Sequence, residues 1–342
     1  MAKEEISVKL IHPQQIRVSS GSAIALGLLK GKMDAAPTTA YLMTFKKGKC
    51  TANCGFCPQA RDSQSDSELL SRVSWPSFSS SAVIGNIGRA AQLGIIKRVC
   101  VQSLNYPKVF DDLCGFVSAL KKEASIPISV SCQPSNTENM WNLAKAGVDQ
   151  IGISLDAATE GLFNKIKGSS AGSYYVWDYE FVLLRAAIGI FGEGKVSTHL
   201  IVGLGETEKQ AVHLLQVCVN MGVLPGLFAF TPIHGTALAS KAQPQVEAYR
   251  RVQLSRYLLV NALSRFEEMS FDSAGRVIDF GVGKNILLRV VESGKPFLTS
   301  GCPNCNRPFY NEKPSGPIYN FPRELKLEEK EVIKNQLSQF VF

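Results

Sequence analysis

The sequence predicts an α/β protein built as a (β/α) barrel of six to eight units. Two observations lead to this fold class. Short β-branched runs alternate with helical patterns along most of the chain, which indicates parallel strands joined by crossover helices. The chain has 342 residues, of which 45% are hydrophobic, so it is long enough to close such units around one large core.

The expected strands and helices alternate in chain order. Strands are predicted at residues 39–45, 96–104, 127–132, 150–155, 195–203 and 226–233. Helices are predicted near residues 78–93, 109–123, 136–146, 175–192, 206–221 and 245–266, and Gly147 and Gly222 stand just after two of them. Residues 268–275 would add a seventh strand, followed by a helix at 281–292.

Three parts are expected along the chain. Residues 1–35 predict an N-terminal helical extension, residues 36–295 the barrel, and residues 296–342, which are rich in Pro and Asn, an irregular C-terminal tail. In such barrels the chemistry lies on loops at the carboxyl ends of the strands.

Composition narrows the class of protein. Nine cysteines are an odd number in a chain too large to need disulfides, which favours reduced thiols with metal or redox chemistry. The net charge of +8 suits an acidic partner, but no arginine-rich arm or zinc-finger spacing supports nucleic acid. Residues 1–20 lack an apolar signal core and no apolar run is long enough to cross a bilayer, so we expect a soluble, cytoplasmic protein without membrane contact.

The segment KGKCTANCGFCPQA, residues 47–60, holds three cysteines in a C-x3-C-x2-C pattern after the first predicted strand. Structural zinc sites usually pair two C-x2-C units, and this spacing does not match them. Cys50, Cys54 and Cys57 instead suit a 4Fe-4S cluster in which each thiolate binds one iron and the fourth iron has an open site. Zinc stays the alternative interpretation.

This segment, with Phe56 directly before the last cysteine, resembles the signature of the radical S-adenosylmethionine (SAM) superfamily. The resemblance implies that SAM binds the open iron and is cleaved to a 5'-deoxyadenosyl radical that abstracts hydrogen from a substrate. Residues 150–157 and 196–210 resemble two further segments of that family. It implies adenosine or ribose contacts from Phe56, Ser154, Asp156, Gly203, Gly205 and Glu206.

Those contacts have structural alternatives. Asp156 could cap a helix, and the Gly203 to Glu206 segment could be a tight turn before one. The glycine-glycine-glutamate turn that holds the SAM amine in the family is absent, and Gln102 and Ser103 are the nearest candidates in its place.

The order of motifs also resembles biotin synthase, which carries a second iron-sulfur cluster as sulfur source. Cys100 occupies one corresponding ligand position, but Ser129, Ser197 and Asp272 stand at the others. The tail supplies Cys302 and Cys305. If the tail folds over the barrel mouth, Cys100 and Cys132 would complete four thiolates for a second 4Fe-4S cluster, with zinc again the alternative.

A biotin-synthase-like chain with this tail is most similar to the lipoyl synthases that work as a split pair of proteins. That resemblance implies sulfur insertion into an octanoyl chain on a lysine of an acidic carrier domain, from a sacrificial second cluster. It also implies an electron donor such as ferredoxin and a second radical SAM protein as partners. The alternatives are biotin synthase, acting on dethiobiotin, and a zinc-stabilised binding protein without catalysis.

Two further residues receive plain structural interpretations. His199 on the fifth predicted strand has apolar neighbours, which favours a hydrogen-bonded core histidine. Arg307 in the tail is expected to face solvent.

Overall fold

A curved sheet of eight strands organises the molecule in the computed structural model, which describes residues 13–341. The strands lie in the order β10, β9, β8, β7, β6, β2, β1, β5. The six from β2 to β10 are parallel, and β1 pairs antiparallel with both β2 and β5. Within the described residues β5 and β10 do not pair, so the sheet is a partial barrel and not a closed one.

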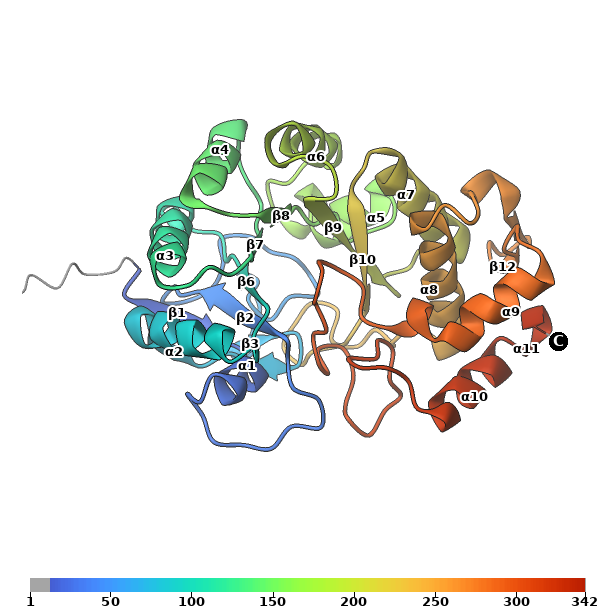
Figure 1. The fold of residues 1–342 in the computed structure, drawn as a ribbon. Coiled ribbons are helices and arrows are strands. Elements are labelled where there is room, and N and C mark those ends of the chain that lie inside the picture. The colour runs from blue at the N-terminus through green and yellow to red at the C-terminus, as the bar shows by residue number, and fades with distance from the viewer. Residues whose placement is uncertain (1–12, 342) are drawn as a thin grey trace, which may run out of the picture.

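All six predicted strands of the barrel are confirmed. Their bounds are β2 (Thr39–Thr44), β6 (Arg98–Gln102), β7 (Ile128–Ser131), β8 (Gln150–Gly152), β9 (Val196–Val202) and β10 (Leu224–Ala229). The predicted helices between them are confirmed as α2 (Ser80–Gln92), α3 (Val109–Glu123), α4 (Thr137–Ala146), α6 (Trp177–Phe191), α7 (Glu208–Asn220) and α8 (Val246–Val260). Figure 1 shows these helices on the outer side of the sheet. One short helix, α5 (Glu160–Ile166), was not predicted.

Strand periodicity separates two faces of the sheet. In β9 the residues alternate between buried and half-buried, so that Val196, Thr198 and Leu200 pack under the helices while Ser197, His199 and Ile201 face the inside of the partial barrel. Parallel pairing continues this inner row onto the neighbouring strands. The inner face therefore carries polar and sulfur-containing side chains, and the hydrophobic core lies between the sheet and its helices.

Two expectations about the segments that flank the barrel need correction. Residues 1–12 lie outside the described residues, and the rest of the expected helical extension contains strand β1 (Gln15–Val18) as well as helix α1 (Ser20–Ala25). The prediction that residues 268–275 form a seventh strand of the barrel is wrong. Residues 270–279 form a separate hairpin of β11 (Ser270–Phe271) and β12 (Val277–Asp279), because a turn between Asp272 and Gly275 reverses the chain.

The C-terminal part is more regular than expected. After α9 (Lys284–Ser293) and a short 3-10 turn at Lys295–Phe297, the chain runs as a loop to residue 326 and ends in α10 (Leu327–Gln336) and α11 (Ser338–Val341). Two small pairings complete the fold, the β3 (Leu69–Leu70) and β4 (Val73–Ser74) hairpin and the edge strand β5 (Ser77–Ser79).

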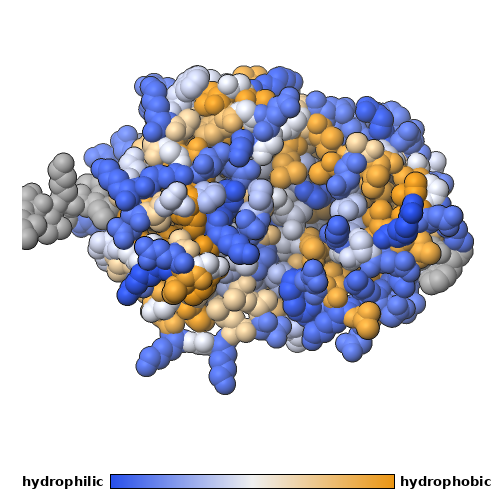
Figure 2. Space-filling model, in the orientation of Figure 1, coloured by the Kyte–Doolittle hydropathy of each residue, from blue (hydrophilic) through white to orange (hydrophobic). Residues whose placement is uncertain are grey.

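The visible surface agrees with a water-facing exterior. Figure 2 shows hydrophilic residues over much of the periphery of this face, with hydrophobic residues in smaller groups between them. Across residues 13–341, none of the helices has both the length and the apolar character that a bilayer crossing demands.

Candidate active site

A cavity of about 280 Å³ lies inside the partial barrel and is lined by two separate groups of cysteines. The first cysteine group, Cys50, Cys54 and Cys57, lies on the loop that follows the carboxyl end of β2. The second cysteine group consists of Cys100, which lies in the middle of β6, and Cys302 and Cys305 from the C-terminal loop. The two groups therefore reach one cavity from different depths of the barrel.

Local hydrogen bonds shape the loop of the first cysteine group. The Cys50 amide donates to the carbonyl of Gln59 at 2.9 Å, and the Cys57 amide donates to the carbonyl of Cys54 at 2.9 Å. The side chain of Gln59, which is fully buried, donates to the carbonyls of Ser67 and Leu69. The Asn105 amide donates to the Cys50 sulfur at 3.1 Å, as expected for a backbone amide that supports a metal-binding thiolate.

The donor set of this group fits an iron-sulfur cluster. Burial raises the pKa of Cys54 well above its usual value and that of Cys57 to about 12, so a cationic metal is needed to hold these thiols as thiolates at neutral pH. Within the described residues no three His, Cys, Asp or Glu side chains surround a single metal-ion position. A cubane does not require such an arrangement, because each thiolate binds a different iron.

Four polar residues form one side of the cavity: Ser154 and Asp156 after β8, Lys167 after α5, and His199 within β9. Asp156 has a backbone φ of 64° and accepts a hydrogen bond from the buried Lys167 ammonium at 2.8 Å. It does not cap α5, whose cap is Thr159. The Ser154 hydroxyl lies 3.0 Å from Nδ1 of His199. Burial lowers the pKa of His199 from 6.5 to about 4, so this histidine is a neutral hydrogen-bonding group.

The glycine-rich turn after β9 has a clear structural role. The Glu206 carboxylate accepts hydrogen bonds from the amides of Gly203 at 2.6 Å, Leu204 at 3.0 Å and Gly205 at 3.0 Å. Burial raises the pKa of Glu206, and these amides partly offset the shift. Among the described residues, the cavity lining includes Phe56, Ser154 and Asp156 but not this turn. Glu206 therefore stabilises the turn through these three hydrogen bonds and does not line the cavity.

Contacts from three strands fix the second cysteine group. Nε2 of the Gln102 side chain donates to the Cys100 sulfur at 3.1 Å, the Ser129 hydroxyl donates to Cys302 at 3.5 Å, and the Tyr41 hydroxyl lies 3.5 Å from Cys305. Burial raises the pKa of Cys100, and the neighbouring Cys302 and Cys305 raise it further. Three soft donors thus line one part of the cavity, each able to bind a different iron of a second cluster.

The C-terminal loop reaches this position from the amino ends of the strands. The Thr38 amide donates to Asn306 at 3.0 Å, and Nε of Arg98 donates to the carbonyl of Pro303 at 3.0 Å. The Leu227 amide donates to the Ser300 hydroxyl oxygen at 2.7 Å. Thr38 and Arg98 stand at the starts of β2 and β6. Residues 303–306 of the tail therefore lie at the amino ends of β2 and β6. Further along, the carbonyl of Asn311 accepts the Thr231 hydroxyl at 2.9 Å just beyond the carboxyl end of β10, so the tail is not confined to the mouth where it was expected.

Cys132 does not join the second cysteine group. It follows β7, in which the Ser129 hydroxyl contacts Cys302 and Ser131 lines the cavity, so the two-residue period turns Cys132 toward the helices. Burial raises its pKa, and its charged neighbours are Cys114 of α3 and Glu180 of α6 rather than the tail cysteines. Cys132 therefore reaches the cavity wall from the helix side, and the expected set of four thiolates becomes a set of three.

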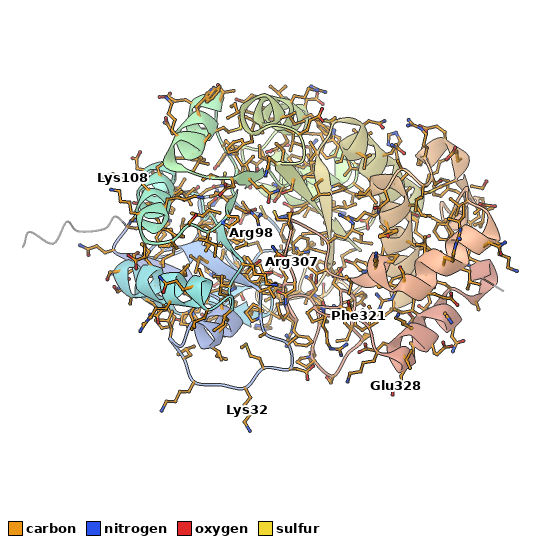
Figure 3. The ribbon with its side chains drawn as sticks, in the orientation of Figure 1. Lys32, Arg98, Lys108, Arg307, Phe321 and Glu328 are labelled. Atoms are coloured by element: carbon orange, nitrogen blue, oxygen red, sulfur yellow. The ribbon has the colours of Figure 1, made fainter. Side chains whose placement is uncertain are left out.

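Several site residues could not be found from the sequence. Lys167 and Arg98 stand in unremarkable segments and acquire their roles through distant partners. Arg307, expected to face solvent, is half-buried and lies over the ring of Phe228 at 3.8 Å. Figure 3 shows Arg98 and Arg307 near the centre of the molecule. Gln102, a candidate for the SAM amine, lines the cavity, and its side chain donates to the Cys100 sulfur.

Comparison with known proteins places this geometry in a family. The model of the radical SAM superfamily matches residues 47–218. A biotin synthase of Prochlorococcus marinus (strain MIT 9515) is 26% identical over 275 residues, which cover 78% of this chain and 76% of that protein. A biotin synthase of Neorickettsia sennetsu (strain ATCC VR-367 / Miyayama) is 26% identical over 243 residues, covering 69% of each.

Solved structures show a similar fold. Methylornithine synthase matches with a TM-score of 0.50 at 14% identity over 65% of this chain and 62% of that one. HydG, a maturase of the [FeFe]-hydrogenase, matches with a TM-score of 0.50 at 13% identity over 74% of this chain and 62% of that one.

Proposed function

Because the chain belongs to the radical SAM superfamily, we propose that it is an enzyme that inserts sulfur at an unactivated carbon and uses a second iron-sulfur cluster as the sulfur source. The observation that carries this proposal is the second cysteine group, Cys100, Cys302 and Cys305, which lines the same cavity as the first. An enzyme that only cleaves SAM would need the first group alone.

The chain would hold its cofactors through its thiols and position them with its cavity walls. A 4Fe-4S cluster on Cys50, Cys54 and Cys57, with SAM bound, supplies the hydrogen abstraction that opens a C–H bond. Tyr41, Met43 and Leu104 belong to one buried apolar cluster, and Cys50, Cys100 and Cys305 all pack against it. Such a cluster would help to keep water from the cavity, where the reacting carbon would lie.

The relatives favour dethiobiotin as the substrate, because those compared above are biotin synthases. The sequence resemblance alone favours the octanoyl chain first and dethiobiotin second. A specific observation keeps the octanoyl chain on a carrier-domain lysine as the second candidate. Ser129 and Ser197 face the inside of the barrel where the resemblance to biotin synthase expects cysteine ligands, and two of the three thiolates come from the C-terminal loop. The net charge of +8 also suits an acidic carrier.

A direct comparison of substrates tests the proposal. The protein is purified without air, reconstituted with iron and sulfide, and incubated with SAM, a reductant and either dethiobiotin or an octanoylated carrier domain. We expect 5'-deoxyadenosine and a product whose mass increases by sulfur. A Cys54→Ala variant should form neither, while Cys114→Ala, which alters a helix cysteine outside the cavity, should form both.

Two outcomes would contradict the proposal. A colourless wild-type protein that binds zinc and yields no 5'-deoxyadenosine would favour the zinc-stabilised binding protein. SAM cleavage without sulfur transfer to either substrate would remove the sulfur-insertion assignment and leave another radical SAM reaction.

A further inference from the structure

Lys167 is a buried cation with an unusually complete set of partners. Its side chain is 2% exposed, and it directly follows α5. A buried ammonium is costly unless it is paired, and here Nζ donates to Oδ2 of Asp156 at 2.8 Å and to the carbonyl of Ser154. The rings of Phe163 and Tyr175 lie 5.7 and 5.3 Å from the same nitrogen and enclose it.

The charges around Lys167 connect it to the first cysteine group. Burial lowers the pKa of Lys167, but the charges of Asp156, Glu180 and Cys54 outweigh this effect and the pKa is raised, so the ammonium stays charged. Burial in turn raises the pKa of Cys54, and Lys167 is the charged neighbour that opposes the shift. The geometry agrees, because Lys167 and Cys54 line the same cavity and Cys54 packs in one cluster with Phe163 and Tyr175, the rings that enclose Lys167.

The same ammonium also fixes the orientation of Asp156. The backbone of Asp156 is held by two hydrogen bonds, from its amide to the carbonyl of His199 and from the Ile201 amide to its own carbonyl, each 2.8 Å. Its Oδ2 is bound by Lys167, whereas Oδ1 has no hydrogen-bond partner within residues 13–341. Since Asp156 lines the cavity, the free oxygen is available to a ligand there.

We propose that Lys167 is a positioning residue of the SAM and cluster site: it orients the Asp156 carboxylate toward the bound cosubstrate, and its charge stabilises the reduced state of the cluster on Cys50, Cys54 and Cys57. Reduction adds negative charge to the cluster, and a nearby cation in a buried site favours that charge. The inference rests on the proposed function only for the presence of this cluster and of SAM.

The test compares Lys167→Met and Lys167→Arg with the matched control Lys165→Met, which removes an exposed lysine two residues away. Each reconstituted protein is assayed for iron content, for the midpoint potential of the cluster by spectroscopic redox titration, and for SAM affinity by equilibrium dialysis. In Lys167→Met we expect unchanged iron, a more negative potential, and a SAM dissociation constant raised about tenfold, the effect of one lost oriented contact. Lys167→Arg should restore the potential and only part of the affinity, because its planar guanidinium meets Asp156 differently.

A second neutral variant keeps the test decisive if Lys167→Met does not fold. Lys167→Gln removes the charge but retains a donor for Asp156, so it should lower the potential and largely keep SAM affinity. A wild-type potential in either neutral variant overturns the inference. So does failure of both neutral variants to fold, which would make Lys167 purely structural. A wild-type protein without cluster or SAM binding would instead contradict the proposed function itself.

Discussion

His199 gives the protein a defined sensitivity to acid. This histidine lies inside the partial barrel, bound through Nδ1 to the Ser154 hydroxyl and packed on the ring of Phe228. Burial lowers its pKa from 6.5 to about 4, and the positive charges of Arg307 and Lys167 add to the shift against the opposing charge of Asp156. His199 is therefore neutral in the folded protein at neutral pH.

The sign and size of the effect follow from this depressed pKa. Stabilisation by neutral His199 is fully present above pH 6.5 and is lost as the pH falls toward 4, because the unfolded chain binds the proton first. At 1.36 kcal/mol per pKa unit, the shift from 6.5 to about 4 corresponds to about 3 kcal/mol, most of which is lost by pH 4.5.

Urea unfolding of the cluster-free protein between pH 7 and pH 4.5 measures this loss. Wild type should lose about 2 kcal/mol more than His199→Gln over that interval, since glutamine cannot titrate. Glu180 and Glu312, whose pKa values burial raises to about 7, lose stabilisation as the pH rises, and they cancel in the comparison because both proteins contain them. An exposed control, His213→Gln, should follow wild type. Parallel curves for wild type and His199→Gln would refute the argument.

Three further variants test the turn and the second cysteine group. Gly203→Ala should lower the free energy of unfolding by about 3 kcal/mol, because φ is 105° and a Cβ would lie 2.8 Å from Pro244, whereas Gly189→Ala in open helix surface should not; equal urea midpoints would contradict this. Cys132→Ser should keep the full iron content of the reconstituted protein, because Cys132 is not expected to bind a cluster. If the variant lost the iron of a whole cluster, Cys132 would have to be a ligand of the second cluster. Cys305→Ala should still cleave SAM but transfer no sulfur; product formation at the wild-type rate would remove the C-terminal loop from the mechanism.

The sequence was a good guide wherever the signal is local. The strands of the barrel follow from β-branched runs. A glycine just after a helical pattern predicts a left-handed helix end, and Gly147 ends α4 in that conformation. The register between strands is not local. Residues 127–132 were correctly predicted as a strand region, but which of Ser129, Ser131 and Cys132 faces Cys100 depends on pairing that places Cys100 opposite Ser129. Reading the cysteines along the chain could not supply that alignment.

The two cysteine groups differ in where the barrel anchors their loops. The loop of Cys50 has partners within residues 49–69, and it is also tied to Asn105, Ile166 and Leu238 from later in the chain. The loop of Cys302 and Cys305 is held by Thr38, Arg98 and Leu227, each on or beside a different barrel strand. Those three anchors meet only after the parallel sheet has formed. The first loop instead follows the carboxyl end of β2, so variants that weaken the amino ends of β2 or β6, where Thr38 and Arg98 hold the C-terminal loop, should disturb the second cysteine group before the first.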